Sequence, residues 1–161
     1  MPDTGPHIAI AAVCERVLIE QDGVMSIIRV VDRLTQTATG VEPPEQMPPF
    51  LVKESDLRMV IALKSDKARG RCTIKVVLED PSGQRVPVGQ SDVTLQPGIG
   101  GTNMNIGMNL AIQHEGVHWF DVLLGGPREQ KDQLMTRVPL DVVYARQHVP
   151  GSPPEKSAEE D

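Results

Sequence analysis

The residues of this chain with the clearest chemical potential are His114, Glu115 and His118, in the stretch His-Glu-Gly-Val-His. This spacing spells the H-E-x-x-H signature of zinc hydrolases, in which two histidines bind the ion and the glutamate activates water. The chemistry requires an α-helix, because there residues i and i+4 lie one turn apart on the same face. On a strand the same two side chains stand about 13 Å apart at about 3.3 Å per residue, too far for one zinc ion.

The sequence around the motif predicts a strand and not a helix. Before the motif, apolar and small polar residues alternate with period 2, the apolar ones being Met104, Ile106, Met108, Leu110 and Ile112. In the middle of a helix Gly116 would cost about 1 kcal/mol relative to alanine. We therefore expect His114 and Glu115 in a hairpin turn and His118 at the start of a strand whose core face continues through Phe120. Zinc-dependent hydrolysis through the three motif residues is kept as the alternative hypothesis.

Other motifs assign no chemistry, so we predict no catalytic, cofactor-binding or metal-binding residues and no cofactor. The chain has no nucleophile elbow, phosphate loop or dinucleotide fingerprint, and we interpret the glycines of residues 97–101 as a flexible connection. Asp32 ends an apolar run and is expected to be half buried, accepting backbone hydrogen bonds there. Cys14 and Cys72 are expected to be small buried thiols.

Composition limits the classes of partner. The chain has 161 residues and a net charge of −6, and its basic residues are scattered along the sequence. Phosphate contacts need a basic face, so nucleic acid and acidic membrane surfaces are not expected as partners. No segment resembles a signal peptide or a membrane span, which predicts a cytoplasmic protein.

Turn residues divide the chain into segments of strand length. The expected strands and turns are 8–20, a turn at Asp22-Gly23, 24–34, 57–64, 71–79, a turn at 80–83, one or two edge strands in 84–95 with Pro87, 103–112, 117–124 and 134–144. Four prolines in residues 35–50 predict a long loop or crossover there. This pattern predicts an all-β fold, an immunoglobulin-like antiparallel β-sandwich of about eight or nine short strands.

The domain organisation expected from composition is simple. Residues 1–7 form a flexible N-terminus, residues 8–146 the β-sandwich domain, and residues 147–161 a disordered acidic tail rich in proline, serine and charge.

Two resemblances support this interpretation. The stretch Glu115–Phe120 resembles the start of strand F in immunoglobulin-like sandwiches, with His118 in the place of the corner tyrosine. More widely, the chain resembles an uncharacterised bacterial single-domain family over roughly residues 8–145. The matching motifs are AAVCE at 11–15, IIRVVDRL at 27–34, DPSG at 80–83, GVHWF at 116–120 and VPLDVV at 138–143. That resemblance implies a β-sandwich and a bacterial protein, and it transfers no catalytic residues.

The function expected from these observations is a non-enzymatic module that works by contact with another protein of unknown identity. The candidate contact surfaces are the proline-rich loop 41–50 and the edge strands. Binding of a small ligand between the sheets is a further alternative, because a methionine-rich aliphatic core would permit it.

Overall fold

In a computed structural model of the chain, residues 5–126 and 131–151 are described. This part forms eleven strands: β1 (His7–Ile19), β2 (Met25–Val30), β3 (Arg33–Gly40), β4 (Phe50–Val52), β5 (Arg58–Asp66), β6 (Gly70–Glu79), β7 (Arg85–Leu95), β8 (Gly98–Gly107), β9 (Leu110–Ile112), β10 (Gly116–Gly125) and β11 (Gln133–His148).

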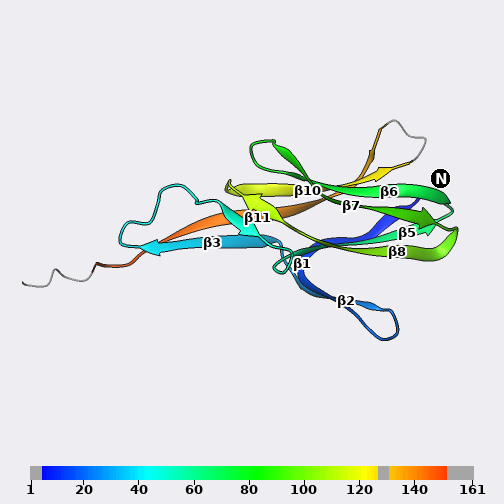
Figure 1. The fold of residues 1–161 in the computed structure, drawn as a ribbon, viewed down its shortest axis with the longest axis horizontal. Helices are drawn as coiled ribbons and strands as arrows, with labels where there is room; N and C mark the ends of the chain where they lie inside the picture. Colours follow the sequence, from blue (N-terminus) through cyan, green and yellow to red (C-terminus); the bar gives the residue numbers. More distant parts are fainter. Residues whose placement is uncertain (1–4, 127–130, 152–161) are drawn as a thin grey trace, which may run out of the picture.

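The strands form two main sheets and one short ribbon (Figure 1). Sheet A has the order β2-β1-β5-β8, sheet B has the order β3-β11-β10-β6-β7, and β4 pairs with β9. All strand pairs are antiparallel except β11 with β3, which is parallel. The predicted all-β sandwich is confirmed, while the expectation of purely antiparallel pairing is wrong for this one pair.

The core lies between the two sheets and is built mainly from aliphatic side chains. β6 shows why these residues form a strand, since Cys72, Ile74, Val76 and Leu78 are buried while the residues between them are half-buried. Phe120 is the largest fully buried side chain and comes from β10. The two cysteines are buried as predicted, Cys14 on β1 and Cys72 on β6.

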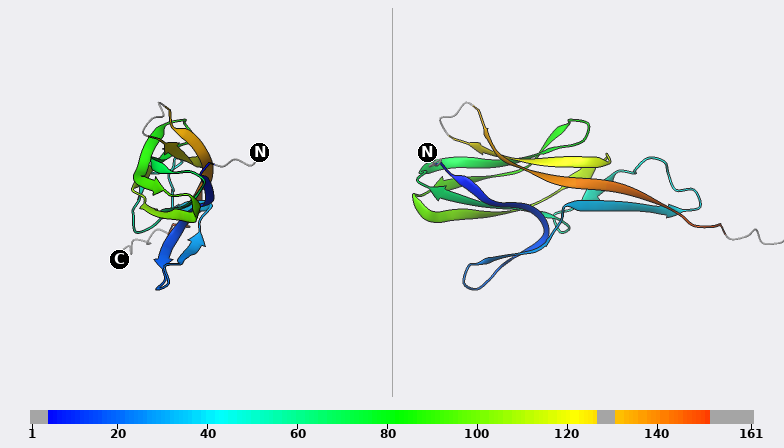
Figure 2. Two further views of the ribbon diagram at one scale, coloured as in Figure 1. Left: turned by 90° about the vertical axis from the view of Figure 1, so that its right-hand side faces the viewer. Right: turned by 180° about the vertical axis from the view of Figure 1, so that it is seen from behind.

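Two wings extend from the sandwich. The first is the β1–β2 hairpin, because β1 pairs with β5 up to Cys14 and from there to Ile19 pairs with β2. The expected turn closes it: Glu20 N–H donates to Val24 O at 2.8 Å, and Gly23 takes a positive φ of 80°. The second wing is the parallel pair of β3 with the last half of β11, which runs along the long axis (Figure 2).

Several predicted boundaries are corrected. Residues 35–40 were expected in a loop but belong to β3, because the four prolines begin only at Pro43. The glycines at 98–101 belong to β8 and do not form a flexible connection. Asp32 is exposed, and its backbone carbonyl, not its carboxylate, accepts a bond from Asp141 N–H at 2.9 Å. The count of eight or nine strands is too low.

At the ends of the chain, β1 begins at His7 and β11 continues through His148, two residues into the predicted tail. Residues 1–4 and 152–161, which carry most of the two terminal predictions, lie outside the described residues. Within the described ranges no helix is long and apolar enough to cross a membrane.

Candidate functional site

The three motif residues lie at the junction of β9 and β10, where the chain turns. His114 and Glu115 are in the turn, as predicted, and His118 is the third residue of β10. Gly116 opens the strand with a positive φ of 116°, a conformation that favours glycine. The strand prediction is confirmed, and the one-turn helical spacing that zinc hydrolysis needs is replaced by extended backbone.

His118 is part of the core, with 1% of its surface exposed. Its Nδ1 lies 3.1 Å from the Gly116 carbonyl oxygen, which can only accept, so Nδ1 carries the proton. Burial lowers the pKa of His118, and the bond to the Gly116 carbonyl and the nearby Asp80 charge only partly offset that effect. The side chain is therefore a neutral imidazole that anchors the start of β10 to its own backbone.

His114 contacts the β6–β7 turn. Its Nδ1 is 3.0 Å from Asp80 Oδ2, while Asp80 Oδ1 accepts from the Ser82 hydroxyl at 2.6 Å and from Gln84 N–H at 2.9 Å. Burial would raise the pKa of Asp80, but the bonds from Ser82, Gln84 and His114 together hold it below its usual value. The predicted Asp-Pro-Ser-Gly turn is thus organised by its aspartate, and His114 binds that ionised carboxylate.

Glu115 is turned to a third partner, since its Oε1 accepts the backbone N–H of Tyr144 on β11 at 2.7 Å. The three motif residues therefore bond to three different partners: His118 to a backbone carbonyl, His114 to the Asp80 carboxylate, and Glu115 to a backbone amide. In residues 5–126 and 131–151 no group of three histidine, cysteine or acidic side chains is placed to hold a metal ion. A hollow of about 190 Å³ lies beside His118, with Asp80 and Gln113 among its lining residues.

A closed ring of charged side chains on the outer face of sheet B escaped the sequence analysis. Asp121 is only 3% exposed, and its two carboxylate oxygens accept from Arg137 Nε at 2.6 Å and Arg85 Nη2 at 2.9 Å. Glu79 closes the ring by pairing with both arginines. The Arg137 guanidinium lies 5.0 Å from the centre of the Trp119 ring. The hydrogen bond to Asp121 raises the pKa of Arg137, so its guanidinium keeps its charge.

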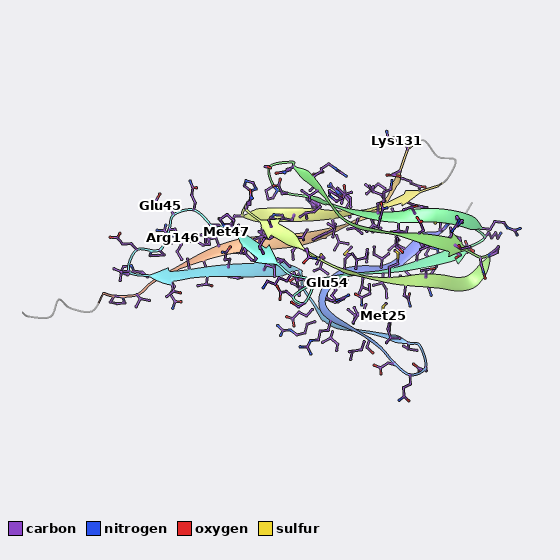
Figure 3. All side chains as sticks on the ribbon, viewed as in Figure 1. Met25, Glu45, Met47, Glu54, Lys131 and Arg146 are labelled. Carbon is purple, nitrogen blue, oxygen red and sulfur yellow. The ribbon has the colours of Figure 1, made fainter. Side chains whose placement is uncertain are left out.

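The proline-rich loop 41–50 was one of the predicted contact surfaces, and it is held against the second wing by hydrogen bonds, its last residue Phe50 opening β4. Tyr144 donates its hydroxyl to Pro44 O at 3.0 Å, Arg146 Nη2 donates to Pro43 O at 3.3 Å, and Gln36 Nε2 donates to Pro48 O at 3.1 Å. Figure 3 shows Arg146 on β11 close to the loop that carries Glu45 and Met47. The loop therefore has a fixed path although it contains no regular structure before Phe50.

The β1–β2 hairpin carries the densest group of exposed apolar side chains. Within the described residues twelve large apolar side chains are exposed, and five belong to this hairpin: Leu18, Ile19, Val24, Ile28 and Val30. The single strand predicted over 24–34 is wrong, because the chain divides there into β2 and β3 in different sheets. β2 pairs only with β1 at the edge of sheet A, which leaves its apolar side chains exposed. Figure 3 shows the hairpin itself extending away from the sandwich, with Met25 on β2 labelled.

Comparison with known proteins adds little to this description. No family model matches the chain, and no curated protein sequence matches it. Among solved structures, a β-glucosidase from Listeria innocua is similar over 61% of this chain and 16% of its own length, with 16% sequence identity and a TM-score of 0.35.

Proposed function

We propose that this protein is a non-enzymatic interaction module that binds another protein through the β1–β2 hairpin. The observation that carries the proposal is the concentration of exposed apolar side chains on that hairpin, led by Ile19 and Val30, each 64% exposed. Contiguous apolar surface on a folded domain marks a site of association, because water contact with it is unfavourable.

Both faces of the hairpin offer apolar contact. The pairs Val17 with Ile27 and Ile19 with Met25 lie on one face, and Leu18 lies on the other, opposite Ser26. A two-stranded hairpin is marginally stable in water by itself, so contact with a partner would also order it. The Arg29–Glu15 ion pair and the Ser26–Glu20 hydrogen bond give the hairpin a polar rim of the kind that surrounds interface cores.

The remaining features agree with such a role. The residues of the zinc signature make hydrogen bonds that stabilise the fold. The buried thiols Cys14 and Cys72 suit a reducing compartment, and on that ground we propose a cytoplasmic location. The chain's acidity and scattered basic residues favour a protein partner over nucleic acid.

The proposal is tested by placing a photoreactive amino acid at position 19 in the native host. We expect a discrete cross-linked protein that disappears when Leu18→Ser is added. The matched control is the same probe at Val86, which is 40% exposed on β7 outside the hairpin. Identical cross-links from positions 19 and 86, or none from either, contradict the proposal.

A further inference from the structure

Part of β1 presents an unpaired edge. Residues 7–14 pair with β5 on one side, and β2 begins to pair on the other side only at Cys14. Among the described strands none pairs with this outer edge over residues 7–12. The register passes from Ile8 to Ile10 with a shift at Ala9, so the edge includes a bulge.

The first half of β11 presents a second unpaired edge. β10 pairs with it from Gln133 to Val142, whereas β3 joins the opposite side only at Asp141. In the described part of the chain, residues 133–140 therefore have strand pairing on one side alone.

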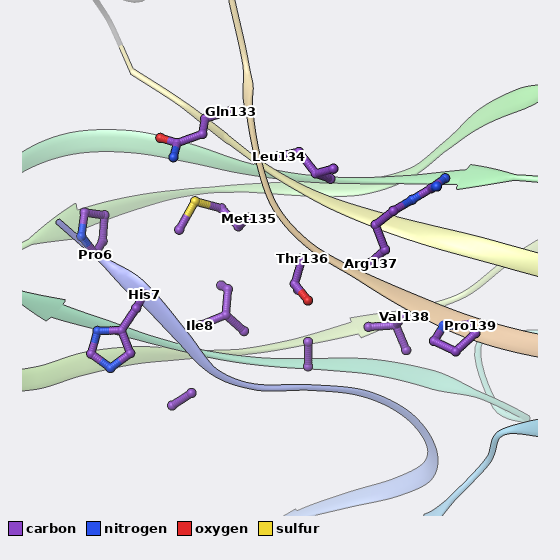
Figure 4. Close-up of a pocket in the computed structure, with 12 residues that line it drawn as sticks. Pro6, His7, Ile8, Gln133, Leu134, Met135, Thr136, Arg137, Val138 and Pro139 are labelled. Carbon is purple, nitrogen blue, oxygen red and sulfur yellow. The ribbon is translucent and has the colours of Figure 1, made fainter. Parts of the chain in front are cut away.

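These two edges border a single open groove of about 570 Å³ (Figure 4). The groove, named here the β1/β11 groove, is lined by Pro6–Ala9, Ala11 and residues 133–139. Four of its apolar side chains, Ile8, Ala11, Met135 and Val138, also pack against the core and are only partly buried. The core is thus incompletely covered here, where β2 does not yet pair with β1 and β3 does not yet pair with β11.

The backbone groups that face the groove follow from two hydrogen bonds at its inner end. Val13 O accepts from Val31 N–H at 2.8 Å on the outer side of β1, so by strand alternation Ala11 also directs its N–H and C=O outward. Asp141 N–H donates to Asp32 O on the outer side of β11, so Pro139 and Arg137, the next two alternate residues toward the start of the strand, also face outward, Pro139 with a carbonyl but no N–H.

We propose that the β1/β11 groove binds an extended segment of a partner protein by β-strand addition, with apolar side chains at alternate positions of the segment covering the exposed rim of the core. Main-chain hydrogen bonds to the unpaired edge of β1 supply affinity, β11 lines the opposite wall of the groove, and the period-2 apolar contacts supply selectivity. The unpaired edge of β1 accommodates a segment of about six residues, or about 20 Å.

The chemistry of the groove favours a partner strand over the alternatives. Its lining contains no carboxylate, and the Arg137 charge is already paired with Asp121 and Glu79, so a neutral segment is preferred to a basic one. A second copy is disfavoured because each chain carries a net charge of −6. The chain's own residues 152–161 contain no large apolar residue to fill the rim.

The opposite side of the sandwich is the internal control. There β7 and β8 border a second groove, the β7/β8 groove, lined by residues 90–94 and 102–106, of which six are serine, threonine, asparagine or glutamine. The Ile106 side chain packs onto β7 at Gly89, since a Cβ placed there would lie 2.8 Å from Ile106 Cγ2. This side offers an added strand mainly hydroxyl and amide side chains.

The test uses a capped seven-residue peptide of alternating threonine and valine, and the same peptide with N-methylated valines. With the first peptide at saturating millimolar concentration, amide hydrogen exchange of Ala11 and Arg137 should slow at least tenfold. Ala9→Lys should weaken peptide binding about tenfold, because it introduces a charge into the groove, and Ala11→Pro should weaken it similarly by removing an outward N–H. Thr94→Lys, an equally exposed strand position on the β7/β8 groove, should leave binding within twofold of wild type.

Four results would overturn the inference. They are an unchanged exchange rate at Ala11 and Arg137, equal binding of the N-methylated peptide, equal weakening by Thr94→Lys, and protection that grows with protein concentration alone, which would assign the groove to self-pairing. The hairpin variant Ile19→Ser should bind the peptide normally. The groove inference and the hairpin proposal therefore succeed or fail separately.

Discussion

The two long sides of the sandwich have similar strand edges but are lined by different side chains. Each is bordered by one edge of sheet A and one edge of sheet B. On the β7/β8 side most groove residues are polar, and Gly89 leaves room for the Ile106 side chain to pack against β7. On the β1/β11 side the edges carry alanine, leucine, methionine and valine, and four apolar side chains of the lining are partly buried against the core.

The difference indicates which edges of a sandwich remain unpaired and which can pair with an added strand. β7 carries Pro87 and a register shift between Val76 and Val77 of its partner, two features that discourage further pairing. The β1/β11 side carries similar features, namely a bulge at Ala9 on β1, a register shift of β11 against Val122 and Leu123, and Pro139 within β11. The two sides are therefore distinguished by the side chains that line them and not by the regularity of their strands.

The largest expected effect comes from breaking the tight packing of β8, one wall of the β7/β8 groove. A Cβ on Gly101 would lie 2.2 Å from Leu63 O, so Gly101→Ala forces β8 away from β5. We expect a loss of about 3 kcal/mol in unfolding free energy by urea titration. Gly100→Ala is the matched control, because a Cβ there meets nothing within 4 Å. Equal loss in both variants would show that β8 is not tightly packed.

A smaller effect is expected from the charged ring, which spans sheet B from β7 to β11 and so joins the two sides. Asp121→Ala removes the buried carboxylate that both arginines bind, and should cost about 2 kcal/mol in urea unfolding. In a double-mutant cycle with Arg85→Ala the two losses should not add, because they break the same contact. Strict additivity would mean that the ring does not act as a unit.

Acid stability tests the core that both sides share. Burial lowers the pKa of His118 in the folded chain. Below pH 6.5, the ordinary imidazole value, His118 therefore binds a proton in the unfolded chain more readily than in the folded chain. Stability therefore falls as pH decreases from 6.5 toward 5, by at most about 1.4 kcal/mol per pH unit. His118→Phe should flatten this part of the stability profile. An unchanged slope would assign the acid sensitivity to other groups.

The smallest effect on stability is expected at the groove rim. Leu134 is 50% exposed, so Leu134→Ser should change unfolding free energy by no more than about 0.5 kcal/mol. The same substitution should weaken binding of the alternating peptide about twofold, measured by exchange protection. Val86→Ser, at a similarly exposed position on β7, should change neither quantity. A loss of peptide binding in both variants would remove the distinction between the sides.

The sequence predicted those parts of the fold in which one face of a strand is buried. The alternation from Met104 to Ile112 predicted the buried face correctly but as one strand, whereas the structure divides it into β8 and β9 in different sheets. The turn residues at Gly23 and Gly83 placed two hairpins. It could not predict β3, because that strand, rich in threonine, lies in a wing and has little apolar periodicity. Nor could it predict that β3 runs parallel to β11, since side-chain periodicity does not encode the direction of a partner.

The candidate sites were predictable to a smaller extent. The turn and strand positions of His114 and His118 followed from Gly116 and the period-2 pattern, and His118 does donate to an upstream carbonyl. The charged ring was missed because its members come from four strands, and one aspartate in the apolar run of β10 was the only signal. The grooves depend on where one strand stops pairing and the next begins, which is a property of register.

The positions of the strand ends determine how the molecule would respond to tension. β1 begins near one end of the long axis and β11 finishes at the other (Figure 1). Tension applied between these points would act along the strands, so the hydrogen bonds of β1 with β5 and of β11 with β3 and β10 would be loaded together in shear, not opened one at a time. The parallel β3–β11 wing would then serve as a clamp, and the sandwich as a link that resists stretching along its length.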